Sequence, residues 1–398
     1  MRVILAALNA KYIHTNLAVR SLRQCAKEAG FDVSIAEYTV NHSFDALLAA
    51  LYREQPEIVA FSCYLWNVAL VRRLCVELKK LLPAVRLWVG GPEVSFRGPS
   101  FLRENPAVEL VMAGEGEVTF VRMLRQLHNG GSLSGVPGLW LRQERDTVFT
   151  GDAVLPALDA LPFPYEDLDA LTGRILYFET SRGCPFSCSY CLSSRGGVRL
   201  MSAEKACQSL DLFLENRVRQ VKFVDRTFNC NRAHCDAILT HLLAHDNGVT
   251  NFHFEISADL LAETTLSLIR QARPGQFQFE IGVQSVNPKT IRAVRRGCDN
   301  QALFRKVERL RECGNCHLHL DLIAGLPYED YASFGASFDR VYRAEPDMLQ
   351  LGFLKVLSGS KMEEDCRTYQ ILFQSDPPYE VLRTPWLSYG GLLRLKGV

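Results

Sequence analysis

The sequence predicts an α/β protein with two domains, a doubly wound parallel sheet followed by a partial (β/α)6 barrel of the TIM type. Apolar, strand-like runs alternate with amphipathic, helix-like segments through residues 1–150, and the same alternation returns through residues 174–357. Residues 151–173 contain three prolines and show no clear periodicity, so we expect them to link the two domains.

The first series contains five short apolar runs that are typical of buried strands: Val3–Leu8, Val33–Glu37, Ile58–Ser62, Arg86–Val89 and Leu110–Ala113. Helical periodicity fills the intervals at Thr15–Ala29, Ser43–Glu54, Asn67–Leu82 and Glu117–His128. Short apolar strands joined by helices predict a flavodoxin-like parallel sheet that is covered on both faces and binds ligands at the carboxyl ends of its strands. A turn at Gly130 and a small hairpin, Trp140–Leu141 with Val148–Thr150, should follow.

The second series offers six strand candidates: Ile175–Thr180, Val221–Val224, Asn251–Ile256, Gln276–Gly282, His317–Ile323 and Met348–Phe353. Helical segments lie between them, for example Ala203–Asn216, Ala233–His245 and Ala302–Arg311. Six units are fewer than the eight of a closed barrel, so an incomplete barrel with an open side is expected. Residues 358–398 have an irregular pattern, which predicts a covering tail or a truncated third domain.

Composition sets limits on the partners. The 398 residues carry a formal net charge of +1, which gives no basis for expecting nucleic acid or a membrane surface as a partner. No run approaches the ~20 apolar residues of a membrane span, and the N-terminus lacks a signal-peptide pattern. Thirteen scattered cysteines favour reduced thiols and a cytoplasmic location. The basic group Arg292, Arg295 and Arg296 is expected on a solvated helix face.

The strongest signal is a cysteine loop directly after the first strand of the second series. Cys184, Cys188 and Cys191 follow the pattern Cys-x3-Cys-x2-Cys, at the end of the barrel where active sites lie. Closely spaced thiolates suit an iron–sulfur cluster or zinc. A structural zinc site needs four ligands, and a 4Fe–4S cluster held by three cysteines keeps one iron open. A zinc site and three unrelated cysteines remain the alternatives.

This motif, with the aromatic Tyr190 before its last cysteine, resembles the signature of the radical S-adenosylmethionine (SAM) superfamily. The resemblance implies that Cys184, Cys188 and Cys191 hold a 4Fe–4S cluster whose open iron chelates the amino and carboxylate groups of SAM. It also implies that an electron from the cluster cleaves SAM to a 5′-deoxyadenosyl radical, and that the backbone near Tyr190 touches the adenine.

Later segments resemble the same family in the same order. The usual Gly-Gly-Glu is absent at the end of the second strand, where Asp225 would replace it and meet the SAM amine. Further SAM contacts would come from strand ends, namely Ser257 from the third strand, Glu280, Gln284 and Ser285 from the ribose-contacting segment, and Leu326 from the adenine side.

Loops at the expected carboxyl edge of the first sheet resemble the cobalamin-binding domain found ahead of radical SAM barrels. They contain Gly-Gly-Pro and Gly-Glu-Gly-Glu segments and no dinucleotide fingerprint after the first strand. The candidate cobalamin-binding residues are Asn9, Tyr12, Tyr64, Trp66, Gly90, Gly91, Pro92, Glu93, Gly114, Glu115, Gly116 and Glu117. Alternatively, the glycines only make tight turns. The motif Asp-x-His-x-x-Gly is absent, so His14 is not expected to bind cobalt.

Together these resemblances imply a cobalamin-dependent radical SAM methyltransferase that acts on an unactivated carbon of a small-molecule or peptide substrate. A reducing partner such as flavodoxin or ferredoxin would supply the electron. A radical cyclase or rearrangement enzyme is an alternative. So are a methylthiotransferase, with a second cluster on Cys25, Cys63 and Cys75, and a non-enzymatic cobalamin-binding regulator. The pairs Cys230/Cys235 and Cys313/Cys316 are expected to be buried structural thiols.

Overall fold

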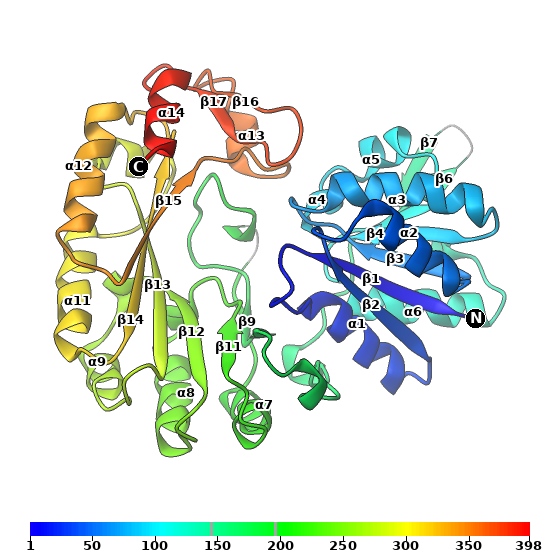
Figure 1. The fold of residues 1–398 in the computed structure, drawn as a ribbon, viewed down its shortest axis with the longest axis horizontal. Coiled ribbons are helices and arrows are strands. Elements are labelled where there is room, and N and C mark those ends of the chain that lie inside the picture. Colours follow the sequence, from blue (N-terminus) through cyan, green and yellow to red (C-terminus); the bar gives the residue numbers. More distant parts are fainter. Residues whose placement is uncertain (144–145, 195–196) are drawn as a thin grey trace. The chain divides into compact units, whose positions relative to one another are not determined.

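A computed structural model describes residues 1–143, 146–194 and 197–398 (Figure 1). Its contacts divide the chain into two compact units, Met1–Arg174 and Ile175–Val398, and each is built on its own sheet. Among the described helices, none combines the length and apolar character that crossing a membrane requires.

The first unit is organised by a seven-stranded sheet. Its strands pair in the order β2 (Val33–Thr39), β1 (Val3–Asn9), β3 (Ile58–Ser62), β4 (Arg86–Gly90), β5 (Leu110–Met112), β6 (Leu139–Gln143) and β7 (Asp146–Phe149). The first five strands in this order are parallel, and β6 and β7 add an antiparallel hairpin at the β5 edge. The chain therefore reverses its direction of strand addition between β2 and β3, as a doubly wound sheet does.

Helices cover both faces of this sheet and bury two separate apolar cores. One face packs against α2 (Phe44–Arg53), α3 (Val68–Leu81), α4 (Pro92–Ser95) and α5 (Gly98–Glu104), and the other packs against α1 (Leu17–Glu28) and α6 (Glu117–His128). Helix α1 begins where the Asn16 side chain accepts a hydrogen bond from the backbone N–H of Val19, and it ends before Gly30, whose positive φ stops the helix.

The second unit is organised by a six-stranded, wholly parallel sheet. Its strands pair in the order β15 (Met348–Phe353), β14 (His317–Ala324), β13 (Phe277–Gln284), β12 (Asn251–Ile256), β11 (Gln220–Phe223) and β8 (Leu176–Phe178). No described residues pair β8 with β15, so the barrel stays open between its first and last strands. The connecting helices are α7 (Ala203–Glu215), α8 (Arg232–Ala244), α9 (Glu263–Ile269), α10 (Pro288–Ala293), α11 (Asn300–Cys313) and α12 (Tyr331–Tyr342).

Alternation along the barrel strands separates a helix-facing apolar side from a polar interior. Phe252, Phe254, Phe277 and Phe279 are fully buried, and the ring centroids of Phe254 and Phe223 lie 4.5 Å apart in a tilted arrangement. The residues next to them in sequence, such as His253 and Glu280, must point to the opposite side, because successive side chains of a strand alternate. This alternation places ionisable groups inside the barrel.

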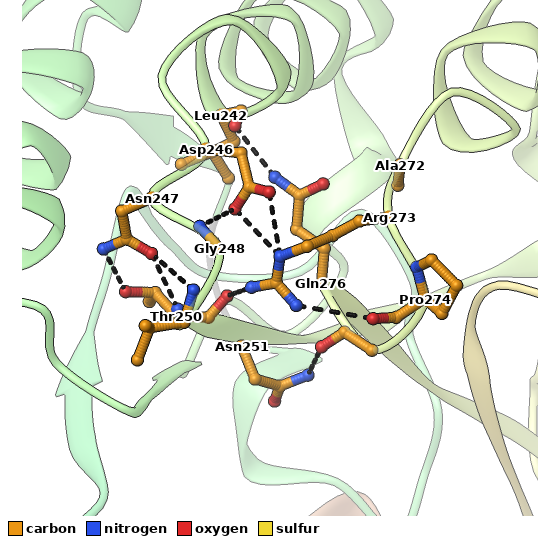
Figure 2. Close-up of polar contacts among 12 residues, drawn as sticks. Leu242, Asp246, Asn247, Gly248, Thr250, Asn251, Ala272, Arg273, Pro274 and Gln276 are labelled. Atoms are coloured by element: carbon orange, nitrogen blue, oxygen red, sulfur yellow. Dashed lines mark hydrogen bonds and ion pairs between the residues drawn. The ribbon is translucent and has the colours of Figure 1, made fainter.

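The amino ends of β12 and β13 are held by a polar network around Arg273 (Figure 2). Its guanidinium donates to both carboxylate oxygens of Asp246, at 2.8 and 3.1 Å, and to the backbone oxygen of Thr250 at 2.6 Å. The side chain of Gln276 donates to the backbone oxygen of Leu242 at 2.9 Å. These bonds tie two loops at the end of the barrel opposite the cysteine loop and leave the carboxyl ends free for function.

The residues after β15 are more regular than the sequence pattern indicated. They form α13 (Lys361–Asp365), β16 (Leu372–Phe373), β17 (Val381–Arg383) and α14 (Tyr389–Lys396). The backbone N–H of Val381 donates to Leu354 O at 2.9 Å, which fixes β17 next to the segment that leaves β15. A Cβ atom on Gly325 would lie 2.6 Å from a methyl group of Val381, so this segment packs directly over the end of β14.

The predicted fold class is confirmed by these two sheets, and most predicted elements appear with ends shifted by a few residues. The prediction of an irregular tail was wrong for α14. This helix begins after Ser388, whose side chain accepts a hydrogen bond from the backbone N–H of Gly391. Two glycines in its first turn conceal the helical pattern. Short elements complete the fold: β9 (Ser181–Arg182), β10 (Arg199–Leu200) and the 3-10 helices η1 (Leu133–Gly135), η2 (Leu158–Ala160), η3 (Asp169–Leu171), η4 (Leu192–Ser194), η5 (Phe228–Cys230) and η6 (Ala258–Leu260).

Candidate functional site

The cysteine loop is closed at its base by the short antiparallel pair β9 and β10, in which Arg182 lies opposite Arg199. Gly183 adopts a φ of +97°, and a Cβ atom there would collide with the backbone oxygen of Gly197. Only glycine permits both this backbone conformation and this close approach. The two ends of the loop are thereby pinned together at the carboxyl end of β8.

Cys184, Cys188 and Cys191 line the wall of one cavity, which encloses about 750 Å³ with the open solvent at its mouth included. Cys188 is buried and the other two are partly exposed. The sulfur of Cys184 lies 3.5 Å from the hydroxyl of Thr227, and the backbone N–H of Ser193 donates to the sulfur of Cys191 at 3.4 Å. The loop therefore presents three thiols to the barrel mouth.

The spacing of the thiols discriminates between a cluster and a single ion. Among the described residues, three potential ligand atoms lie within 4.8 Å of one another only at Asp211, His241 and His245, which lie on α7 and at the end of α8. At least one pair of the three cysteine sulfurs is therefore more than 4.8 Å apart, whereas Zn–S bonds of ~2.3 Å would hold the ligands of one zinc ion roughly 4 Å apart. The donor set and its spacing fit a multi-iron cluster better than zinc.

The other walls of this cavity come from the carboxyl halves of four strands and from the loops that follow them. These residues are Arg226 and Thr227 after β11, Glu255, Ile256 and Ser257 at the end of β12, Glu280, Gly282 and Gln284 of β13, and Asp321 of β14. Phe186, Tyr190 and Arg296 complete the lining. The cavity is therefore polar and carries both signs of charge.

Two glutamates of this wall have opposite electrostatic states. Burial raises the pKa of Glu255 to about 7. Burial also acts on Glu280, but hydrogen bonds and positive charge from His253 and Lys222 outweigh it and lower the pKa of Glu280 to about 2. At neutral pH Glu280 is a fixed anion, whereas Glu255 can hold or release a proton at the cavity wall.

The first unit has its own cavity, at the carboxyl edge of its sheet between α1 and α6. It encloses about 670 Å³, open solvent included. Its floor is apolar and includes Leu5, Trp88, Phe120 and Met123, while its rim carries backbone from Gly90, Gly91, Gly114 and Gly116 together with Tyr64 and Glu117. An apolar floor with an exposed backbone rim suits a large ligand that has a planar apolar part and polar edges.

Gly91 and Gly114, two glycines of the rim, differ in the space that surrounds their Cα atoms. Gly91 has a φ of +112°, and a Cβ atom there would lie 2.5 Å from the backbone oxygen of Cys63. Gly114 has a φ of +81°, and a Cβ atom there would meet only Ala153, at 3.6 Å. Gly91 is therefore required by the turn itself, whereas Gly114 leaves open space at the rim.

Family comparison gives each unit an assignment. Residues 3–124 match the B12 binding domain, residues 178–341 match the Radical SAM superfamily, and residues 367–398 match a protein family of unknown function (DUF4080). The chain is a B12-binding radical SAM protein. The predicted family is confirmed by these matches.

The B12-binding radical SAM protein has similar relatives of known name. It is 29% identical over 319 residues to the cobalamin-dependent radical SAM methyltransferase TokK of Streptomyces tokunonensis. The alignment covers 70% of this chain and 44% of TokK. The chain thus spans less than half the length of this curated relative.

Solved structures of low sequence identity share its fold. The methyltransferase TsrM from Kitasatospora setae, with cobalamin and a 4Fe–4S cluster bound, aligns with a TM-score of 0.80 at 17% identity, over 94% of this chain and 76% of TsrM. The cobalamin-dependent SAM radical enzyme OxsB, with aqua-cobalamin and SAM bound, aligns with a TM-score of 0.80 at 17% identity, over 99% of this chain and 66% of OxsB.

Most predicted SAM-binding residues of the radical SAM protein reach the barrel cavity, and three do not. Tyr190, Ser257, Glu280 and Gln284 line it together with the three cysteines. Asp225, Ser285 and Leu326 are buried and are absent from the lining. The hydroxyl of Ser285 instead donates to a carboxylate oxygen of Glu329 at 2.5 Å.

Asp225, which follows β11, is hydrogen-bonded to the segment that follows β8. Its carboxylate accepts hydrogen bonds from the backbone N–H and the hydroxyl of Thr180, at 2.9 and 2.7 Å, and from the hydroxyl of Ser181 at 2.6 Å. Burial raises the pKa of Asp225 to about 6, against the lowering effect of these bonds. This geometry does not support the predicted contact between Asp225 and the SAM amine.

The B12-binding unit brings half of the predicted cobalamin residues together. Tyr64, Gly90, Gly91, Gly114, Gly116 and Glu117 line the cavity, whereas Asn9, Tyr12, Trp66, Pro92, Glu93 and Glu115 do not. Asn9 is occupied in donating to His14 O and to Glu37, at 2.8 and 2.9 Å. Trp66 stacks on Tyr64 with ring centroids 4.6 Å apart, so it supports the ring of a rim residue without lining the cavity itself.

Several lining residues of the barrel cavity were not predicted from the sequence, including Arg226, Glu255 and Asp321. A signal for them exists, because charged residues recur at every second position within otherwise apolar strands, as in His253 with Glu255 and His319 with Asp321. In a strand, such residues share one face, and here that face is the barrel interior.

The expectation of a solvated basic face was wrong for one of its three arginines. Arg292 and Arg295 are exposed, but Arg296 lies in a loop after α10 and points into the barrel cavity. The three cysteines of the methylthiotransferase alternative do not share one site. Cys63 and Cys75 are buried in the same apolar core, whereas Cys25 lies on α1, which covers the opposite face of the sheet, so this arrangement gives no support to a second cluster.

Proposed function

We propose that the chain provides the cobalamin-binding and radical SAM parts of a methyltransferase that acts on an unactivated carbon. The observation that carries the proposal is that three thiols converge on one polar cavity at the carboxyl end of a barrel. This barrel follows a domain of the B12-binding family with its own glycine-rimmed cavity. The relative TokK, a cobalamin-dependent radical SAM methyltransferase, supports the same reading.

In this proposal Cys184, Cys188 and Cys191 hold a 4Fe–4S cluster. When bound, the cluster would supply the electron that cleaves SAM reductively. SAM then binds between Tyr190 of the cysteine loop and the polar wall that contains Ser257 and Gln284. Glu280 keeps a fixed negative charge beneath it, because Lys222 and His253 hold it ionised. The cavity walls also shield reactive carbon species from water.

The cavity of the first unit fits cobalamin in shape and chemistry. Its apolar floor, with Leu5, Trp88 and Phe120, suits the planar dimethylbenzimidazole of that cofactor, and the glycine rim offers backbone N–H and C=O groups to its polar edges. The open space at Gly114 is a cradle that a side chain would fill. When bound, cobalamin would supply methyl-transfer chemistry, and the missing Asp-x-His-x-x-Gly pattern leaves His14 without a cobalt-binding role.

The proposal requires a reductant and a substrate. A low-potential protein such as flavodoxin or ferredoxin fits the need for single electrons, and the substrate would be a small molecule or a peptide. Thirteen cysteines that form no disulfide and an oxygen-sensitive cluster fit the cytoplasm.

The test is anaerobic purification with iron, sulfide and cobalamin analysis, followed by product analysis with SAM and a strong reductant. We expect about four irons per chain, bound cobalamin, and both S-adenosylhomocysteine and 5′-deoxyadenosine as products. Intact SAM after incubation would overturn the enzyme assignment and favour a cobalamin-binding regulator. Deoxyadenosine without S-adenosylhomocysteine would favour a radical cyclase or rearrangement enzyme.

A matched pair of variants tests the cobalamin cavity. Gly114→Val places a side chain at the open rim, and Gly130→Val makes the same change at a positive-φ glycine that has no atoms near its Cβ position and lies outside the cavity. Gly114→Val should lose bound cobalamin while Gly130→Val keeps it. Equal cobalamin content in both variants would remove Gly114 from the site.

A further inference from the structure

The loop after α10 is attached to the cysteine loop. The backbone N–H of Ser189, the residue after Cys188, donates to Val294 O at 2.9 Å. Two residues later, Arg296 turns back, and its own N–H donates to Ile291 O at 3.1 Å. The position of the Arg296 side chain is therefore fixed relative to Cys188 by the backbone of both loops.

The guanidinium of Arg296 contacts three groups of the cavity wall. Its Nη2 donates to the backbone oxygen of Gly282, and its Nη1 lies 3.4 Å from the Tyr190 hydroxyl and 3.9 Å from the sulfur of Cys188. No carboxylate oxygen of the described residues lies within the 4.0 Å of an ion pair to Arg296, and its Nε is buried without a hydrogen-bond acceptor there. The residue is partly exposed, but its guanidinium is enclosed at Nε and has no counter-anion among the described residues.

A buried charge without a partner is costly, and an arginine cannot lose its proton to escape that cost. Among the groups that the guanidinium contacts, the thiol of Cys188 is the one that can most readily become an anion. Metal coordination would deprotonate the thiol and provide the missing negative charge.

We propose that Arg296 is a positioning residue for the cluster, which holds the Cys188 sulfur by an N–H···S contact and raises the reduction potential of the cluster with its permanent positive charge. The inference rests on the proposed function. On reduction the cluster gains one electron from an external donor and no proton, so its net negative charge grows by one. A cation at hydrogen-bonding distance from a ligand sulfur stabilises the reduced form more than the oxidised form.

The test is a redox titration of the anaerobically reconstituted full chain, followed by the EPR signal of the reduced cluster. Arg296→Met removes the charge, Arg296→Lys keeps a charge, and Arg292→Met is the control because Arg292 is an exposed arginine of the same segment. We expect Arg296→Met to lower the ratio of reduced to oxidised cluster about tenfold at a fixed potential, which is ~59 mV for one electron. Arg296→Lys should recover part of this change, and Arg292→Met should equal the wild type.

The outcomes separate this inference from the proposed function. A wild-type chain that assembles no 4Fe–4S cluster would overturn both. A wild-type cluster whose potential is unchanged in Arg296→Met would overturn only the role of Arg296, and weaker SAM binding in that variant would assign the guanidinium to SAM instead. If Arg296→Met assembles no cluster, assembly by Arg296→Lys supports a requirement for charge, whereas failure of both variants would show a requirement for shape and overturn the inference.

Discussion

The ammonium of Lys222 lies 2.9 Å from a carboxylate oxygen of Glu280, so β11 and β13 are bridged across the intervening strand β12 inside the barrel. The same oxygen lies 3.0 Å from Nε2 of His253, which belongs to β12. One acidic group therefore connects three strands of the sheet. The chain uses this ion cluster, instead of an apolar layer, to fill the space beneath the cysteine cavity.

Lys222→Met should destabilise the second unit by about 1 to 3 kcal/mol, because it removes the cation that pairs with Glu280 in a largely desolvated site and leaves only His253, whose pKa is lowered by burial. The measurement is urea unfolding at pH 7. Lys361→Met breaks an exposed pair with Glu364 and should change stability by less than about 1 kcal/mol. Glu280→Gln in the Lys222→Met background should recover part of the loss, and a strictly additive double variant would contradict the coupling.

Cys188→Ala should reduce the iron and sulfide content of the anaerobically reconstituted protein to near zero, because a 4Fe–4S cluster cannot be held by two thiolates alone. Cys207→Ala is the control, since Cys207 lies on α7 and outside the cavity lining. Iron and sulfide assays with the visible absorbance of the cluster provide the measurement. A Cys188→Ala protein that retains its cluster would remove the loop from the metal site.

Gly91→Ala should destabilise the first unit by more than 2 kcal/mol, because the new Cβ would lie 2.5 Å from the backbone oxygen of Cys63 and the residue has a φ of +112°. Gly130→Ala shares the positive φ, at +70°, but meets no atom within 4 Å. It should cost only about 1 kcal/mol. Chemical unfolding of the two variants compares the cost of collision with the cost of backbone conformation, and equal losses would contradict the steric argument.

Stability of the second unit should fall as pH rises from about 4.5 to about 7, in part because of Glu329. Burial raises the pKa of its carboxyl from 4.5 to about 7, with a smaller contribution from the nearby Asp330 and against hydrogen bonds from Ser285 and Ser337. A raised folded-state pKa means that the native state binds the proton more tightly, so this stabilisation is complete below pH 4.5 and lost above 7.

Glu329→Gln should remove that dependence and be more stable than the wild type by about 3 kcal/mol at pH 8. The two proteins should be similar near pH 4.5. Unfolding measured across this range is the test, with the exposed Glu312→Gln as control. A pH profile of Glu329→Gln that is parallel to the wild type would show that the carboxyl is ionised in the folded protein.

The sequence was sufficient for the elements whose signal is local. Segments rich in apolar residues predicted β12 and β15 at their observed bounds, and helical periodicity did the same for α6. The short helices α4 and α5 were missed, although each has a proline in its first turn, because four and seven residues are too few to show a period.

Site residues could be predicted where their spacing in the sequence indicates their chemistry. They could not be predicted where their position depends on packing between segments that are distant in sequence. The three cysteines are defined by their own spacing, and they share one cavity. Asp225 and Arg296 could not be placed in this way, because one is turned away by Thr180 and the other is turned inward by Gly282. Thr180 lies between β8 and β9 and Gly282 lies on β13, so both partners are distant in sequence. Nothing in the local sequence distinguishes such residues from solvated ones.

The packing of Val381 against Gly325 has an evolutionary consequence. The methyl group of residue 381 occupies the volume that a side chain at residue 325 would need, so the two positions share a single space. A side chain at 325 would need a smaller residue at 381 first, since the reverse order passes through a clash, and it would in either case carry the strain of a φ of +88°. Across related chains these two positions should covary in size, and the order of their substitutions in a lineage should be fixed.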